Sequence, residues 1–251
     1  MAAKETKQRL DHMLQERYPD YSRRQLQSWI MQRKVKVNEV IVDKPGTPVA
    51  ADAIIELDVQ EPKYVSRAGF KLEKALDYFG IDPTGMVMLD AGLSTGGFSD
   101  CLLQRGAKEI FGIDVGYGQA HEKIRQDARV RVMERTNLRH ITPKTIGQLV
   151  DMVTLDLSFI SILKVLDAVD RVLKPGGLLV TLIKPQFEAG KHQVGKGGIV
   201  KDEGVHKEVV AKVTDAVQAK GYQLVGVTDS PILGTEGNKE FLAAFKKEGQ
   251  P

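Results

Sequence analysis

The stretch that most constrains the fold runs from Met86 to Phe98 and reads MVMLDAGLSTGGF. An apolar run ends at Asp90, a glycine-rich turn follows, and a helical pattern begins at Phe98. Open α/β sheets bind nucleoside-containing cofactors at a turn of this kind, because glycines let a ligand approach the backbone and the helix N-terminus presents free N–H groups. We therefore expect a cofactor site at this turn.

The chain after this turn alternates strand-like and helix-like segments. Strands are expected at Val87–Asp90, Glu109–Asp114, Met152–Asp156, Leu178–Ile183, Leu224–Asp229 and Glu240–Phe245. Helices are expected at Arg67–Phe79, Phe98–Arg105, Ser161–Leu173 and Gly204–Lys220. This alternation predicts an α/β fold with a mostly parallel sheet covered on both faces. The 251 residues leave room for a smaller domain in front of it.

Residues 1–60 show the pattern of a small α+β domain. We expect a helix over Arg9–Arg17 and a second helix after Ser22 as its N-cap. Short strands are expected at Val35–Val37, Val40–Val42 and Ile54–Val59. The polar connector Gln60–Ser66 marks the boundary, so we expect domains at 1–60 and 67–251 with a linker at 61–66.

The N-terminal module is locally basic, although the whole chain carries a net charge of only +3. Between Lys7 and Lys36 lie eight basic residues and three acids, Asp11, Glu16 and Asp20. A basic helical segment is the electrostatic footprint of nucleic acid or simply a solvated face, and charge alone leaves both open.

Composition limits the classes of protein to which this chain can belong. No apolar window reaches the ~18 residues of a membrane span, and the N-terminus lacks the apolar core of a signal peptide. Cys101 is the only cysteine, so we expect no intrachain disulfide and no cysteine-rich metal site, and we expect this thiol to be buried. His192 has no clustered partners, so no metal is expected. We expect a cytoplasmic protein.

Asp114, at the end of the second strand, suits the two hydroxyls of a ribose, which NAD and S-adenosylmethionine share. The turn lacks the G-x-G-x-x-G dinucleotide fingerprint, and its Ser94 and Thr95 hydroxyls suit an amino acid end. We favour S-adenosylmethionine. The same residues spell the G-x-S-x-G elbow of serine hydrolases, with His192 or His206 available, but that elbow normally follows several strands.

Four polar residues need a chemical explanation: Lys71 in the first helix, Asp156 and Lys184 at strand ends, and Glu240 at the start of the last strand. Strand carboxyl ends converge on the ligand crevice of an open α/β sheet, so Asp156 and Lys184 are expected beside the cofactor. Each residue alone would be read as part of a surface salt bridge.

The run SRRQLQSWIMQRKVKVNEVIVDKPGTPV resembles the small RNA-binding domain named after ribosomal protein S-four, over about Gln8–Val59. The resemblance implies RNA binding, with cations on phosphates. The residues expected to face RNA are Arg9, Arg23, Arg24, Gln27, Lys34, Lys36, Asn38 and, beyond this module, Arg67. We read the basic, glycine-rich segment Lys191–Lys201 as a mobile RNA-facing loop or a plain solvated loop.

The stretches YVSRAGFKL, LDAGLSTGGFSD, GIDVGYGQ, LDLSFIS, LIKPQFE and GNKEFL resemble the FtsJ class of RNA ribose 2′-O-methyltransferases, and most closely the TlyA family. The resemblance implies a Rossmann-like class I methyltransferase, a catalytic tetrad and ribosomal RNA or ribosomal subunits as partner. The tetrad would be Lys71, Asp156, Lys184 and Glu240. S-adenosylmethionine would contact Asp90, Gly92, Ser94, Thr95, Gly96, Gly97, Phe98, Asp114 and Asn137. Leu93 and Glu236 depart from the family's usual residues.

The chemistry of methyl transfer gives the tetrad a purpose. A ribose hydroxyl is hardly ionised at neutral pH, so an enzyme must align it with the methyl group and manage one proton. Lys184, held by Asp156 and Glu240, would orient or deprotonate the hydroxyl. Alternatives are a non-catalytic ribosome-assembly factor and a haemolysin-like activity, although pore formation needs insertion segments that we do not find. Monomer and homodimer both stay open.

Overall fold

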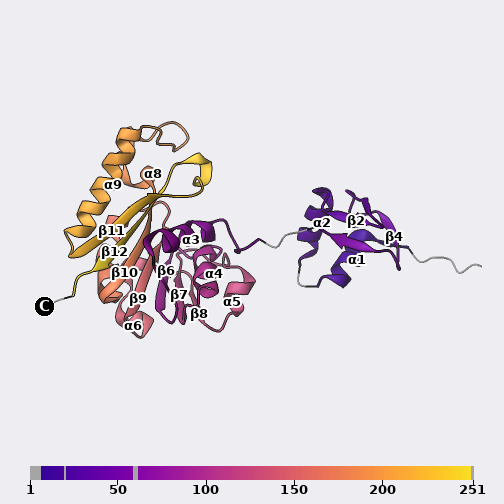
Figure 1. Cartoon of the computed structure of the whole chain (residues 1–251), viewed down its shortest axis with the longest axis horizontal. Coiled ribbons are helices and arrows are strands. Elements are labelled where there is room, and N and C mark those ends of the chain that lie inside the picture. The colour runs from indigo at the N-terminus through magenta and orange to yellow at the C-terminus, as the bar shows by residue number, and fades with distance from the viewer. Residues whose placement is uncertain (1–6, 20, 59–61, 250–251) are drawn as a thin grey trace, which may run out of the picture. The chain divides into compact units, whose positions relative to one another are not determined.

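The computed structural model describes residues 7–19, 21–58 and 62–249, with the side chain of Thr235 left aside. It divides into two compact units, Met1–Pro62 and Lys63–Pro251 (Figure 1). Asp20, Val59, Gln60 and Glu61, which enter the predicted charge cluster, last N-terminal strand and linker, lie outside the described residues.

The described residues of the first unit form two helices and five short strands. They are β1 (Lys7–Arg9), α1 (Leu10–Arg17), α2 (Arg23–Met31), β2 (Val35–Val37), β3 (Val40–Ile41), β4 (Pro48–Ala50) and β5 (Ile55–Leu57). Ser22 caps α2 as expected, because its hydroxyl accepts the Gln25 N–H. Strand β2 lies between β3 and β5, and β1 pairs with β4. Leu10, Leu14, Leu26 and Ile30 are wholly buried in a core of their own.

The second unit is built on a seven-stranded sheet in the order β11-β12-β10-β9-β6-β7-β8. Its strands are β6 (Val87–Ala91), β7 (Glu109–Ile113), β8 (Val130–Met133), β9 (Val150–Leu155), β10 (Leu173–Ile183), β11 (Tyr222–Asp229) and β12 (Phe241–Lys247). Its helices are α3 (Ala68–Phe79), α4 (Gly97–Gln104), α5 (Glu122–Gln126), α6 (Pro143–Ile146), α7 (Leu166–Val172), α8 (Pro185–Glu188) and α9 (Glu203–Gln218). Strand β12 runs antiparallel to β10 and β11, and the other neighbouring pairs are parallel, which confirms the mostly parallel sheet.

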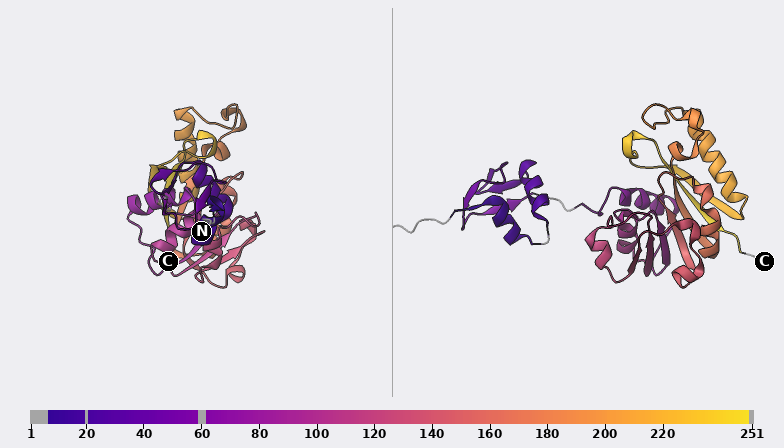
Figure 2. Two further views of the ribbon diagram at one scale, coloured as in Figure 1. Left: turned by 90° about the vertical axis from the view of Figure 1, so that its right-hand side faces the viewer. Right: turned by 180° about the vertical axis from the view of Figure 1, so that it is seen from behind.

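Side chains that alternate along the strands supply a core on each face of the sheet. Leu89 faces the core that includes Val169 and Val213 of α7 and α9. Met88 faces the opposite core, with Leu72 of α3 and Leu102 of α4. Figures 1 and 2 show α3 and α4 beside each other, well away from α9. Continuous apolar strands are typical of a sheet buried on both faces.

Several predicted boundaries were wrong. The expected helix Ser161–Leu173 is split into a 3-10 turn, Ile162–Lys164, and α7, and Leu173 already belongs to β10. Strand β10 therefore starts earlier than expected, with a register irregularity before Leu178. Strands β1, β4 and β8 were absent from the predicted set. They are four residues or shorter, too short for a clear alternating pattern.

Candidate functional site

The order of the strands reverses between β6 and β9, and this is where an open α/β sheet binds its ligand. A cavity of about 460 Å³, here called the switch-point cavity, lies at their carboxyl ends. Five predicted site residues line it. Gly92 and Ser94 lie in the turn after β6, and the other three follow β7, β8 and β9 in turn: Asp114, Asn137 and Asp156. The fold thus brings these residues together as the strand ends predicted.

The backbone at the mouth of this cavity is tightly fitted. Gly92 has φ of +88°, and a Cβ there would lie 2.4 Å from the carbonyl oxygen of Asp156. The Asp114 carboxylate accepts the N–H of Ser94 at 2.8 Å and that of Gly116 at 2.7 Å. Each oxygen keeps a second lone pair, so Asp114 can still accept ligand hydroxyls. Asn137 accepts the Arg139 N–H at 3.1 Å, so it serves as a turn cap and lines the cavity as well.

A smaller cavity of about 80 Å³ adjoins the glycine turn and shares Gly92, Ser94 and Asp156 with the switch-point cavity. Thr95, Gly97 and Phe98 line it. Gly96 lines neither cavity, and a Cβ there would contact Ile124 at 2.8 Å. Gly96 is therefore a packing position in this structure.

Asp90 also lies apart from both cavities, contrary to its expected place against the cofactor. Its side chain has no exposed surface and points from β6 towards α4 and β9. One carboxylate oxygen accepts the Ser99 hydroxyl at 2.6 Å, and the other accepts the Thr154 hydroxyl at 3.0 Å. Burial raises the pKa of Asp90 to about 6, although both hydrogen bonds oppose the shift. Both carboxylate oxygens are therefore engaged inside the fold, and contact between Asp90 and a cofactor stays a prediction.

The four tetrad positions form two buried lysine–carboxylate ion pairs. Lys184 Nζ lies 2.6 Å from Asp156 Oδ1 as an ion pair, at angles outside the range of a hydrogen bond. The same Nζ donates a hydrogen bond to the Ser158 hydroxyl at 3.2 Å. Lys71 Nζ donates to Glu240 Oε2 at 2.6 Å. The expectation that Glu240 holds Lys184 was therefore wrong, because α3 brings Lys71 to this carboxylate instead. Each lysine side chain is only 10% exposed.

A cavity of about 400 Å³, here called the lysine cavity, contains Lys184 and Glu240 in its wall. Sequence reasoning missed Phe159, which lines both this cavity and the switch-point cavity. Phe159 is 91% exposed and has φ of +64°, which is unusual for a bulky residue. Its ring lies 5.3 Å from that of Phe187, which also lines the lysine cavity.

The segment Lys191–Lys201 borders the lysine cavity through Val194 and Gly198. The buried side chain of Asn238 fastens it, accepting the Val200 N–H at 3.0 Å and donating to the Gly198 carbonyl at 3.0 Å. Glu236, one of the departures from the family pattern, lies at the same cavity with φ of +66°.

A serine hydrolase would need a histidine beside Ser94. His206 is buried on α9, where its ring packs against Phe241 and its Nε2 bonds to the Val200 carbonyl at 2.9 Å. His192 lies in a 3-10 turn, and among the described residues no histidine lines either cavity that includes Ser94. Cys101 is buried, as expected, and burial raises the pKa of its thiol to about 11.

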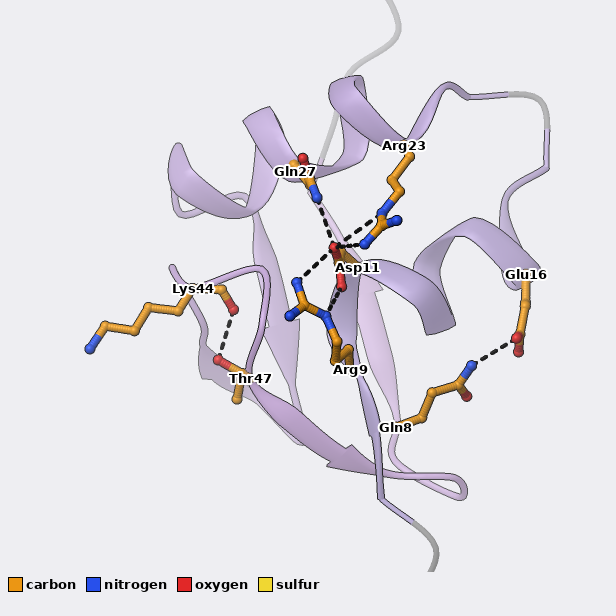
Figure 3. Close-up of polar contacts among 8 residues, drawn as sticks. All are labelled: Gln8, Arg9, Asp11, Glu16, Arg23, Gln27, Lys44 and Thr47. Carbon is orange, nitrogen blue, oxygen red and sulfur yellow. Dashed lines mark hydrogen bonds and ion pairs between the residues drawn. The ribbon is translucent and has the colours of Figure 1, made fainter.

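Some of the residues predicted to face RNA have partners within the protein, and others are exposed. Arg9, Arg23 and Gln27 all donate to the buried carboxylate of Asp11 (Figure 3). Two other predicted RNA contacts have internal partners. Asn38 accepts the Ile54 N–H at 2.9 Å, and Lys36 lies 3.8 Å from Glu56. The side chains of Arg24, Lys34 and Arg67 are exposed.

Comparisons with known proteins agree with this architecture. A family described as FtsJ-like methyltransferase matches residues 64–247, and the S4 domain matches residues 8–55. The 16S/23S rRNA (cytidine-2′-O)-methyltransferase TlyA of Mycobacterium tuberculosis is 43% identical over 93% of this chain and 88% of its own. Hemolysin A of Brachyspira hyodysenteriae is 40% identical over 94% and 99%. The structure of a candidate hemolysin from Streptococcus thermophilus is 39% identical, covers 99% of this chain and 91% of its own, and superposes with a TM-score of 0.74.

Proposed function

The chain belongs to the FtsJ-like methyltransferase family, and we propose that it transfers a methyl group from S-adenosylmethionine to a ribose 2′-hydroxyl, that of a cytidine, in ribosomal RNA. The observation that carries this proposal is the pair of buried lysine–carboxylate ion pairs at the strand ends. Asp156 of one pair lines the switch-point cavity, while Lys184 and Glu240 line the lysine cavity beside it.

The switch-point cavity fits the methyl donor. Its volume of about 460 Å³ is within the range of small-molecule sites. The absence of a Cβ at Gly92 lets the ends of β6 and β9 approach each other closely in the cavity wall, and Asp114 offers carboxylate lone pairs to a ribose. The smaller cavity at Ser94, Thr95 and Gly97 suits the methionine end. Bound there, S-adenosylmethionine would supply a methyl group already activated by its sulfonium.

Lys184 would act on the acceptor hydroxyl. Asp156 and Ser158 hold its Nζ at the junction of the two cavities, which fixes the direction of its remaining N–H groups. An N–H aimed at the acceptor oxygen would turn a lone pair of that oxygen towards the donor and stabilise the negative charge that the oxygen gains as its proton is lost to solvent. The bond from oxygen to the methyl group would form as the bond from sulfur to the methyl group breaks, which leaves the sulfur as a neutral thioether. Lys71 and Glu240 would close the wall around this group and limit the access of water.

Phe159 would bind the nucleotide that carries the hydroxyl. Proteins bind unpaired bases by stacking them on aromatic side chains, and an exposed ring between the two cavities is suitably placed for this. The N-terminal module would hold the surrounding RNA, with Arg9, Arg23, Arg24, Lys34 and Lys36 on phosphates.

Substitution of Lys184 tests the proposal. With ribosomal subunits lacking the modification and labelled S-adenosylmethionine, we expect Lys184→Ala to lower methyl incorporation by about 100-fold or more. Lys174→Ala is a matched control. Lys174 is the second residue of β10, the strand that Lys184 directly follows, and it pairs with Asp151 at the same 2.6 Å, but at the opposite end of β9. The control should methylate normally.

Two outcomes would contradict the proposal. Full activity of Lys184→Ala would remove the lysine from the reaction. RNA binding by the unchanged protein without any methyl transfer would support a non-catalytic assembly factor. Among residues 7–19, 21–58 and 62–249, none of the helices has the length and apolar character of a membrane span.

A further inference from the structure

Asp11 is a buried negative charge at the centre of the basic N-terminal unit. It lies in the first turn of α1, and its side chain has no exposed surface. Its carboxylate accepts from Arg9 Nε at 3.0 Å and Nη2 at 3.1 Å, from Arg23 Nε at 3.2 Å and Nη2 at 2.8 Å, and from Gln27 Nε2 at 2.7 Å (Figure 3). A carboxylate buried in this way is costly unless such partners compensate it.

The carboxylate stays ionised in this environment. Burial acts to raise the pKa of Asp11, but the hydrogen bonds from Arg9, Arg23 and Gln27 outweigh it and hold the pKa well below its usual range. Three elements meet at this charge, since Arg9 ends β1, Asp11 lies in the first turn of α1, and Arg23 and Gln27 belong to α2. The arrangement is therefore a fixed part of the fold at neutral pH.

Both arginines turn one edge inward and remain half exposed. Their side chains are 52% and 49% exposed. Each uses Nε and Nη2 on Asp11, which leaves three of its five N–H groups for another ligand. The Arg9 guanidinium is also confined by the backbone turn at Gly46, where a Cβ would lie 3.3 Å from Nη1. Within the described ranges neither guanidinium forms a further ion pair.

We propose that Asp11 is a positioning residue for RNA, which holds Arg9 and Arg23 in the orientation in which their outer N–H groups meet backbone phosphates. The proposal rests on the RNA-methyltransferase function proposed above. A free arginine loses side-chain entropy when it is ordered, and an arginine already held in place avoids much of this loss on binding. It also follows that Gln27 serves Asp11 rather than RNA, since its amide Nε2 already donates to that carboxylate.

The positioning role and simple electrostatics predict opposite changes in RNA affinity when Asp11 is neutralised. A carboxylate near bound phosphates repels them, so its neutralisation would by charge alone tighten RNA binding about twofold at ~10 Å in water. If Asp11 orients the arginines, its neutralisation frees both side chains and weakens binding. The sign of the change therefore distinguishes the two effects.

The test uses the full-length protein, labelled fragments of ribosomal RNA and a series of salt concentrations. We expect Asp11→Asn to raise Kd about tenfold and to make the dependence of log Kd on log salt shallower, because ordered phosphate contacts are lost. In the methylation assay KM should rise while kcat stays unchanged. Glu16→Gln is the control, because it removes one negative charge from the same helix, yet Glu16 accepts only from Gln8, at 2.7 Å, among the described residues. Its Kd should stay equal or fall about twofold.

A second variant covers the case in which Asp11→Asn does not fold, which thermal unfolding would reveal. Arg23→Lys keeps the charge and leaves Asp11 intact, but an ammonium cannot form the two-bonded fork. We expect it also to weaken RNA binding several-fold with a normal unfolding temperature. RNA binding as tight as that of the unchanged protein, by folded Asp11→Asn or by Arg23→Lys, would overturn the positioning role. Absence of RNA binding by the unchanged protein would overturn the proposed function as well.

Discussion

Asp90 shows how a single buried group can make the stability of the fold depend on pH. Its pKa is raised to about 6, above the usual value of 3.8, so the folded state binds a proton more readily than the unfolded chain does. Stability from this group therefore increases as pH falls through about 6 and is fully gained below the unfolded value. Between about pH 7.5 and about pH 5 the gain is about 1 kcal/mol.

We expect Asp90→Asn to remove this gain. The amide cannot ionise, so the free energy of unfolding, measured with urea at both pH values, should rise less on acidification than in the unchanged protein. Asp151→Asn is the control, because the bonds from Lys174 and the Val87 N–H outweigh burial and lower the pKa of Asp151, which therefore stays ionised throughout this range. An equal rise in Asp90→Asn would show that Asp90 ionises normally.

At the scale of elements, the ends of β6 and β9 approach each other so closely that only glycine fits between them. A methyl group at Gly92 would lie 2.4 Å from the Asp156 carbonyl oxygen, so Gly92→Ala must move one strand end or the other. Both ends line the switch-point cavity. We expect Gly92→Ala to weaken S-adenosylmethionine binding, measured by calorimetry, by about tenfold or more.

A matched glycine separates steric contact from backbone strain. Gly85, just before β6, also has positive φ, +73°, but a Cβ there would meet nothing within 4 Å. Gly85→Ala carries a similar conformational penalty and should bind S-adenosylmethionine normally. If both variants lost binding equally, general destabilisation of β6 would explain the effect, and the close approach at Gly92 would not.

The elements that could be predicted from the sequence are those with long, regular patterns. The apolar runs of β6, β7, β9 and β10 and the amphipathic helices α3, α4 and α9 lie within a few residues of their expected ranges. Helices α5, α6 and α8 are five residues or shorter and give no helical period. Strand β1 forms by pairing with β4 some forty residues later, as with Gln8 opposite Val49, which no local pattern indicates.

The same limit applies to the site. Asp90 and Asp114 both look like acids at strand ends, yet Asp90 lies within β6 and faces α4, whereas Asp114 lies one residue beyond β7 at the cavity. That difference depends on strand register. The pairing of Lys71 with Glu240 joins residues 169 positions apart and depends on how α3 packs over the sheet. The sequence pointed to these two lysines and two carboxylates but not to which lysine pairs with which carboxylate.

At the scale of the whole molecule, binding of RNA and binding of the methyl donor should be separable. The core of the N-terminal unit draws on residues 10–57 alone, and the two cores of the second unit draw on residues 64–245. Every residue of the switch-point cavity belongs to the second unit. We therefore expect residues 63–251 alone to fold and to bind S-adenosylmethionine with unchanged affinity, while KM for ribosomal subunits rises at least about tenfold.

The covalent connection is part of this prediction. When two binding modules are linked, the second binds at an effective concentration near millimolar, and separate modules lose this advantage. Adding residues 1–62 as a separate chain at micromolar concentration should therefore leave KM high, although that chain still binds RNA. Restoration of KM by the added chain would show that the N-terminal unit activates the enzyme rather than tethering it. An unchanged KM in residues 63–251 would show that the methyltransferase unit recognises its RNA without the S4 domain.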